Sequence, residues 1–172
     1  MTVYVVNGIT PTLGARTWVA PTAALIGDVA LGDDSSLWFG TVVRGDVFHV
    51  RIGEETSIQD NTVVHVTHDR YPTLIGNRVT VGHGVVLHGC TVADLVIVGM
   101  GAIILDQAEV AERCIVGAGA LVTPGTKIPA GHLAVGSPAR VKRPLTDEEL
   151  EWLSNSARHY VELTRLYRED PG

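Results

Sequence analysis

The chain has 172 residues, of which 45% are hydrophobic but only 5% are aromatic, with 19 glycines and a formal net charge of −6. This size suits one domain or one domain with a small appendage. The acidic balance and the lack of long basic runs argue against a nucleic-acid-binding surface. No apolar run approaches the ~20 residues that a membrane span needs, and the first residues, MTVYVVNGIT, do not resemble a secretory signal. We therefore expect a cytoplasmic protein that binds neither nucleic acid nor membrane.

Large aliphatic residues recur with a six-residue period through most of the chain. Of the 17 steps between consecutive members, 14 are six residues long. Neither an α-helix nor an alternating strand produces this spacing, whereas hexapeptide β-helices do. A glycine often follows the aliphatic residue, and glycine tolerates the backbone angles that corners require. The members are Val19, Leu25, Leu31, Leu37, Val43, Ile52, Ile58, Val64, Ile75, Val81, Leu87, Val92, Val98, Ile104, Val110, Val116, Val122 and Ile128.

The period resembles that of the left-handed parallel β-helix, in which three hexads form one triangular coil around stacked aliphatic side chains. Left-handed crossovers are rare, so the handedness comes from the resemblance and not from the spacing. We assign residues 1–135 to this β-helix with a short N-terminal lead-in. Three steps break the period, and the longest of them begins directly at His65. Insertions in a solenoid leave the coil as loops, often on the binding face.

A linker and a helix are expected after the repeats. Residues 136–145 are rich in proline and basic residues, which is typical of a linker. Residues 146–172 predict an amphipathic helix, with Thr146 and Glu149 as a capping box. Its apolar stripe indicates that it packs on the β-helix or on a neighbouring subunit. The stripe consists of Leu150, Leu153, Ala157, Tyr160, Thr164 and Tyr167.

Counting the hexads in threes places the histidines on the coils. His65 and His88 follow aliphatic residues at equivalent positions of consecutive coils, with Arg44 in the same column one coil below. His83 belongs to a different side, with Asp60 beneath it. His65 and His88 can therefore share an ion within one chain, whereas His83 would have to reach that ion from another chain.

A threefold trimer brings unlike edges of neighbouring subunits together, and three imidazoles with an open fourth position are typical of catalytic zinc. The alternative is that each histidine is a surface residue or a satisfied core residue. We prefer that interpretation for His49, His132 and His159, and we treat His68 as intermediate.

Four segments carry a more specific resemblance. They are RGD at 44–46, SIQDN at 57–61, VVHV at 63–66 and GHGVVLHGC at 82–90. Together they resemble the γ-class carbonic anhydrases, whose activity is the reversible hydration of CO2 to bicarbonate. The resemblance implies a homotrimer in which His65, His83 and His88 bind Zn2+ between two subunits. Histidine sites also accept Fe2+ or Co2+.

The same resemblance assigns roles to further residues. Arg44 and Asp46 would form the ion pair that aligns the trimer near the metal, and Gln59 would orient the metal-bound solvent. Asp60 would be the polar neighbour of Gln59, and Tyr160 would be a helix tyrosine that approaches the site.

The sequence departs from the family archetype at its proton-transfer residues. Val47 and His68 stand where the archetype has glutamates, and His68 is a possible substitute because histidine titrates near neutral pH. Two alternative functions stay open. One is a CoA-thioester hydrolase or acyltransferase of the hexapeptide class. The segment GSPAR at 136–140 resembles the exit segment of those acyltransferases. The other is a catalytically silent trimer bridged by a metal.

Overall fold

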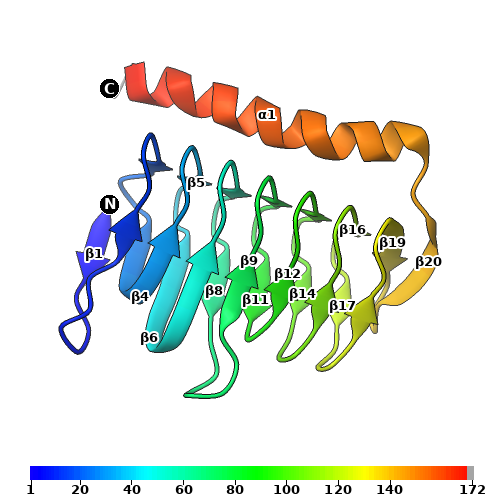
Figure 1. The fold of residues 1–172 in the computed structure, drawn as a ribbon, viewed down its shortest axis with the longest axis horizontal. Coiled ribbons are helices and arrows are strands. Elements are labelled where there is room, and N and C mark those ends of the chain that lie inside the picture. The colour runs from blue at the N-terminus through cyan, green and yellow to red at the C-terminus, as the bar shows by residue number, and fades with distance from the viewer. Residues whose placement is uncertain (170–172) are drawn as a thin grey trace.

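Three columns of stacked aliphatic side chains form the core of a three-sided parallel β-helix. The computed structural model describes residues 1–169, which form about seven turns followed by the helix α1, Asp147–Glu169 (Figure 1). Of the 18 periodic aliphatic residues, 17 are buried, and Val19 at the first coil is partly exposed. The predicted fold class, a hexapeptide β-helix with a C-terminal helix, is confirmed.

The first side of the β-helix is an eight-stranded sheet in which all neighbours are parallel except the last pair. Short strands end at each corner because the chain must turn there. The strands, in sheet order, are β3 (Trp18–Val19), β5 (Ser36–Leu37), β7 (Ser57–Ile58), β10 (Thr80–Val81), β13 (Ile97–Val98), β16 (Ile115–Val116), β19 (His132–Val135) and β20 (Arg140–Pro144).

The second and third sides belong to one twelve-stranded sheet, because the long strands β4 (Ala24–Leu31) and β6 (Val42–Ile52) bend around the corner between them. The second side also contains β1 (Thr2–Tyr4), β8 (Val63–His65), β11 (Val86–His88), β14 (Ile103–Ile104) and β17 (Leu121–Val122). The third side also contains β2 (Thr12–Leu13), β9 (Thr73–Ile75), β12 (Thr91–Val92), β15 (Glu109–Val110) and β18 (Lys127–Ile128).

Residues 136–145, which we expected to form a linker, contain strand β20. It pairs antiparallel with β19 and shifts register between Leu133 and Ala134. The basic residues and proline of this segment suggested a solvated connection, but the same composition suits an exposed edge strand, where proline and charge discourage further pairing. The strand covers one end of the first side and carries the chain to α1.

The helix α1 runs back along the first side, so that its C-terminal end lies above the earliest coils (Figure 1). Its first turn contains the predicted capping box. The Thr146 N–H donates to Glu149 Oε2 at 2.9 Å, and the Glu149 N–H donates to Thr146 Oγ1 at 3.2 Å. Within residues 1–169 no helix is long and apolar enough to cross a membrane. Residues 170–172 of the expected helix lie outside the described residues.

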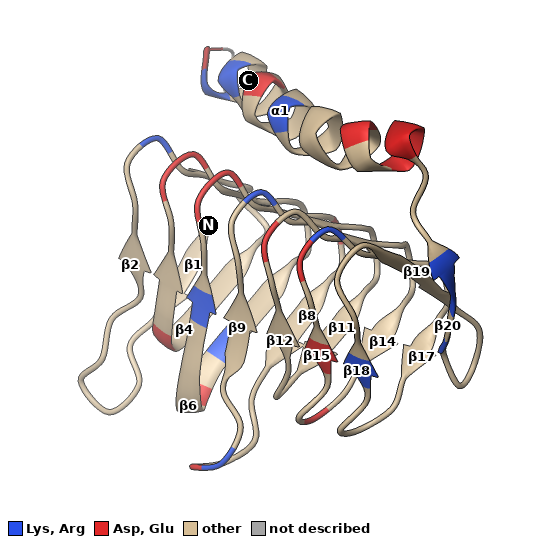
Figure 2. Ribbon diagram, turned by 45° about the vertical axis from the view of Figure 1, so that its right-hand side comes forward, with Lys and Arg blue, Asp and Glu red and all other residues tan. Residues whose placement is uncertain are grey.

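Both ends of α1 are fixed to the β-helix. Arg143 of β20 donates two hydrogen bonds to Glu149, at 2.7 and 2.8 Å, where basic β20 meets the acidic start of the helix (Figure 2). This guanidinium and the Thr146 cap lower the pKa of Glu149 to about 2. At the other end an aromatic cluster packs with ring centroids 4.8 to 6.3 Å apart. The cluster consists of Trp18, Trp38, Phe39, Tyr160 and Tyr167.

The middle of α1 is held by Leu153, which is 1% exposed and packs on Ile97 and Ile115 of the first side. Removing most of this side chain leaves a cavity beneath the helix. We expect Leu153→Ala to lower the free energy of unfolding by about 2–5 kcal/mol. The matched control Leu166→Ala changes a residue of the same helix that is 62% exposed, and we expect it to cost less than about 1 kcal/mol. Urea denaturation of both variants checks the difference, and equal losses would contradict the described packing of α1.

Candidate metal centre

His65 and His88 lie side by side on the second side of the β-helix. Strands β8 and β11 pair in parallel with Val64 opposite Leu87 and His65 opposite His88. Because side chains alternate along a strand, the buried aliphatic residues place both imidazoles outside the coil. His65 Nδ1 and His88 Nε2 are 3.2 Å apart. Val43 pairs with Val64, so Arg44 belongs to the same column, as the counting predicted.

Each of the three candidate histidines has its own carboxylate partner. His65 Nε2 lies 3.1 Å from Asp46 Oδ1, and His88 Nδ1 lies 2.7 Å from Asp106 Oδ1. An ionised carboxylate can only accept a hydrogen bond, so the nitrogen that faces it must carry the hydrogen. When each ring carries a single N–H, the two nitrogens of His65 and His88 that face each other are therefore both lone pairs.

Two lone pairs at 3.2 Å repel each other unless a cation lies between them. A proton could take this place, but burial, the largest effect, lowers the pKa of His65, and the charge of Arg44 acts in the same direction. A metal ion fits the spacing, because two nitrogens bound at 2.0–2.1 Å to a tetrahedral zinc are about 3.3 Å apart. The donor pair thus suits a zinc ion in both chemistry and separation.

His83 lies at the corner that follows the first side, two residues after the buried Val81. Its Nδ1 donates to Asp60 Oδ2 at 2.7 Å, which leaves Nε2 as a lone pair, and its side chain is 52% exposed. Asp60 is the residue that the counting placed beneath it. Within residues 1–169 of a single chain, no three His, Cys, Asp or Glu side chains form a metal-binding group. The structure therefore joins His65 with His88 and keeps His83 apart.

Arg44 and Asp46 form a close ion pair, with Arg44 Nη1 2.6 Å from Asp46 Oδ2. The other oxygen of Asp46 accepts the hydrogen bond of His65. Burial acts to raise the pKa of Asp46, but the hydrogen bonds from Arg44 and His65 outweigh it and the pKa is lowered. Asp46 is therefore ionised at neutral pH and holds the ring of His65 from behind.

Gln59 and Tyr160 share a hollow of about 370 Å3 with His83. The hollow lies between α1 and the first side, and its walls include Met100 and Trp152. Gln59 is only 5% exposed. Burial raises the pKa of the Tyr160 hydroxyl, and the charge of Asp60 adds to this effect. The phenol is therefore a neutral hydrogen-bond donor at physiological pH.

His68 lies away from the other candidates, in the loop between β8 and β9 that projects from the stack (Figure 1). Its side chain is 75% exposed, and Nε2 is 3.1 Å from Asp69 Oδ2. It does line a separate hollow of about 430 Å3 together with Asp46 and His49.

The sequence analysis missed Asp106 as a partner of His88. The only available signal was its position, one coil beyond Gly89, where a residue without a side chain leaves room for a carboxylate. The six-residue period does not point to this contact, because the period identifies inward residues and says nothing about the corners.

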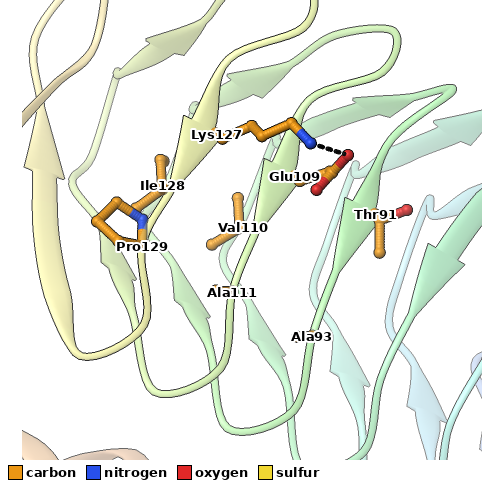
Figure 3. A pocket seen from close by; sticks show the side chains of 8 residues that line it. All are labelled: Thr91, Ala93, Glu109, Val110, Ala111, Lys127, Ile128 and Pro129. Carbon is orange, nitrogen blue, oxygen red and sulfur yellow. Dashed lines mark ion pairs between the residues drawn. The ribbon is translucent and has the colours of Figure 1, made fainter.

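Another hollow, of about 650 Å3, lies on the third side. Figure 3 shows the ion pair between Glu109 and Lys127, whose atoms are 3.0 Å apart, crossing two coils above small apolar residues. None of the predicted site residues lines this hollow. Its two charged groups are already paired with each other and exposed, so the histidine column is the better candidate site.

No family model matches the chain. Among curated proteins, gamma carbonic anhydrase 2, mitochondrial, from Arabidopsis thaliana is 46% identical over 165 residues, which are 93% of this chain and 59% of the relative. A carbonic anhydrase from Geobacillus kaustophilus is 43% identical over 166 residues, which are 96% of this chain and 91% of the relative. The chain belongs to the γ-carbonic anhydrase family.

A solved structure agrees with this assignment of fold. A hexapeptide transferase family protein from Anaplasma phagocytophilum has a TM-score of 0.93 and 42% identity, covering 96% of this chain and 98% of that protein. The chain spans only 59% of the length of the Arabidopsis relative. That relative is named mitochondrial, so a cytoplasmic location for this chain stays a prediction.

Two glycines beside the candidate histidines provide a matched test of the site's packing. Gly84 and Gly89 both have positive φ, but an added Cβ at Gly84 meets nothing, whereas at Gly89 it overlaps Asp106 Oδ1 and lies 3.1 Å from the Cβ of Tyr71. We expect Gly84→Ala to cost only the backbone term of about 1–2 kcal/mol. Gly89→Ala should cost more in urea denaturation because Asp106 must move. Equal costs would contradict the close approach of Asp106.

Proposed function

We propose that this chain is a zinc-dependent enzyme that reversibly hydrates CO2 to bicarbonate. In this proposal His65 and His88 of one protomer and His83 of its neighbour bind the ion in a homotrimer. The observation that carries the proposal is the pair of opposed lone pairs, 3.2 Å apart, on His65 and His88. A cation bound between these two nitrogens would remove their repulsion, and the family membership supports CO2 hydration as the reaction that the cation would serve. Iron or cobalt could occupy the same histidines.

When bound, zinc lowers the pKa of a water molecule toward ~7 and supplies hydroxide that can add to CO2 at neutral pH. The chain's own residues prepare that chemistry. The lowered pKa of His65 keeps its ring neutral, as a metal ligand must be. Asp46, held by Arg44, fixes the His65 ring, and Asp60 does the same for His83. The buried amide of Gln59 would orient solvent, and the neutral hydroxyl of Tyr160 would donate a hydrogen bond.

Hydration also releases a proton that must reach the buffer. We assign this transfer to His68, because its exposed side chain contacts both solvent and Asp69. It shares a hollow with Asp46, so a short water path could connect it to the metal centre. In this assignment His68, in the loop after β8, would carry out the proton transfer that glutamates perform in the family archetype.

The first test measures metal content and activity together. We expect about one zinc per chain and measurable CO2 hydration in stopped-flow assays of the zinc-loaded protein. His88→Ala should remove both, because one nitrogen of the donor pair is lost. His132→Ala is the control, since its ring contacts only the Ala130 carbonyl oxygen at 2.8 Å, and it should keep both. Full zinc occupancy in His88→Ala would contradict the ligand set.

The division of ligands between protomers makes a second prediction. His65→Ala and His83→Ala should each bind little zinc alone. In a random equimolar mixture about one quarter of all interfaces should recover metal, because each trimer that contains both variants has one interface where an intact His65–His88 pair meets an intact His83. Native mass spectrometry can verify the mixing and count the metals. Verified mixing without recovery would contradict ligation across the interface.

A second candidate function is hydrolysis or transfer of a CoA-linked acyl group. Two observations favour it: the Anaplasma relative is named a hexapeptide transferase family protein, and the 370 Å3 hollow beside His83 has apolar walls at Ile97, Met100 and Ile115. Acyl-CoA hydrolysis without CO2 hydration would favour this candidate. Full zinc content with neither activity would instead indicate a silent, metal-bridged trimer.

A further inference from the structure

We infer that Asp106, held in place by Thr67, is a positioning residue that fixes the ring of His88 with its Nε2 lone pair directed at the candidate metal position. The inference rests on the proposed metal site and extends it to a carboxylate and a loop residue that have no assigned role. It also implies that the loop after β8, which carries His68, helps to position His88 through the contact of Thr67 with Asp106.

Both carboxylate oxygens of Asp106 are engaged by side chains. Oδ1 accepts from His88 Nδ1 at 2.7 Å, and Oδ2 accepts from Thr67 Oγ1 at 3.0 Å. Within residues 1–169, no Lys or Arg forms an ion pair with Asp106. The carboxylate therefore has two fixed contacts in different directions, so its position and orientation are both determined.

Thr67 is itself anchored to the inserted loop. Its N–H donates to the Tyr71 carbonyl oxygen at 3.0 Å, and the two residues form an isolated antiparallel bridge. Tyr71 in turn packs near Gly89, the residue that follows His88. The loop that interrupts the six-residue period therefore returns to the coil beside His88 and presents one hydroxyl to Asp106.

A purely structural explanation of Asp106 can be compared with similar corners of the same β-helix. At Gly14, Gly53 and Gly76, a side-chain oxygen from the next coil also occupies the space of a missing Cβ. These oxygens belong to Asp33, Asn77 and Asp94, and each accepts a backbone N–H at 2.8 or 2.9 Å. They cap the turns of the coil and thereby stabilise it.

Asp106 occupies the matching space beside Gly89 but makes a different set of contacts. Its hydrogen-bond partners are the imidazole of His88 and the hydroxyl of Thr67, with no backbone N–H among them in the described residues. The side-chain oxygen that accepts a backbone N–H at the corners of Gly14, Gly53 and Gly76 has its counterpart here directed at a histidine. This contrast favours a positioning role over a role in turn stability.

The consequence for His88 is a fixed tautomer. The bond to Asp106 keeps the hydrogen on Nδ1 and leaves Nε2 as an acceptor, which is the form that a metal requires. Carboxylates placed behind a ligating histidine also raise its basicity, and their loss typically lowers metal affinity by about 10- to 100-fold. Thr67 acts one step further away, by limiting the rotation of the carboxylate.

The test uses the full-length chain and two readouts. Zinc and cobalt dissociation constants are measured by chelator competition, and the His88 tautomer is measured by 15N NMR of the metal-free protein. Asp106→Ala should weaken zinc by about 10- to 100-fold and move the His88 hydrogen from Nδ1 toward Nε2. Asp106→Asn keeps an acceptor oxygen. It should therefore keep a larger fraction of His88 protonated on Nδ1, and a higher zinc affinity, than Asp106→Ala.

Three further variants separate positioning from stability. Thr67→Val, which removes only the hydroxyl, should weaken zinc by about 2- to 10-fold, and Thr67→Ser should restore wild-type binding. Asp94→Ala is the matched corner control and should lower thermal stability without changing zinc affinity, because it removes the oxygen that accepts the Asn77 N–H. Folded Asp106→Ala with wild-type affinity and an Nδ1-protonated His88 would overturn the inference.

The metal-free readout distinguishes this inference from the proposed function. If the wild-type protein binds no zinc or cobalt, the proposed metal site is wrong. An Nδ1-protonated His88 that depends on Asp106 would still support the positioning role in that case. An unchanged tautomer in Asp106→Ala would refute that role whatever the metal content.

Discussion

The in-register pairing of β8 with β11 is the constraint on which the candidate metal centre depends. Parallel neighbours lie about 4.8 Å apart, and the pairing places His65 opposite His88. A shift of the strand register by one residue would turn one histidine into the core and would turn an aliphatic residue out toward solvent. The buried Val64 and Leu87 prevent that shift, because each fills a place in the aliphatic column. The core therefore sets the distance between the two imidazoles.

This arrangement holds the histidines in a state that is unfavourable by itself. Asp46 and Asp106 each require a hydrogen on the far side of their imidazole, so two lone pairs face each other in a partly buried column. Burial also disfavours the proton that could relieve the repulsion at His65. Such a repulsion between two lone pairs persists only where the surrounding structure holds both imidazole rings in place. Here the strand register, the ion pair with Arg44 and the Thr67 contact together provide that determination.

The six-residue period predicted the parts of the structure that depend on which residues face inward. It placed His65 above Arg44 and beneath His88, and it separated His83 from them, because stacking repeats the same position on every coil. The capping box of Thr146 and Glu149 could also be predicted, since both residues lie in one local turn. The family resemblance, and not the spacing, implied that Gln59 and Tyr160 lie near the metal site, and both line the hollow beside His83. The ligand roles of these residues stay predictions.

Contacts made at corners and edges could not be predicted in this way. Asp106 reaches His88 only because Gly89 leaves space and because the inserted loop returns Thr67 to the same point, and neither condition follows from a repeat. Strand β20 depends on an unpaired edge of β19, which exists only once the coils are stacked.

The candidate site itself shows how far a repeat period can predict structure. Its two halves, the pair on the second side and His83 at the first corner, face different directions on one chain, so the proposed chemistry depends on how protomers meet, and a repeat period within one chain does not encode that geometry.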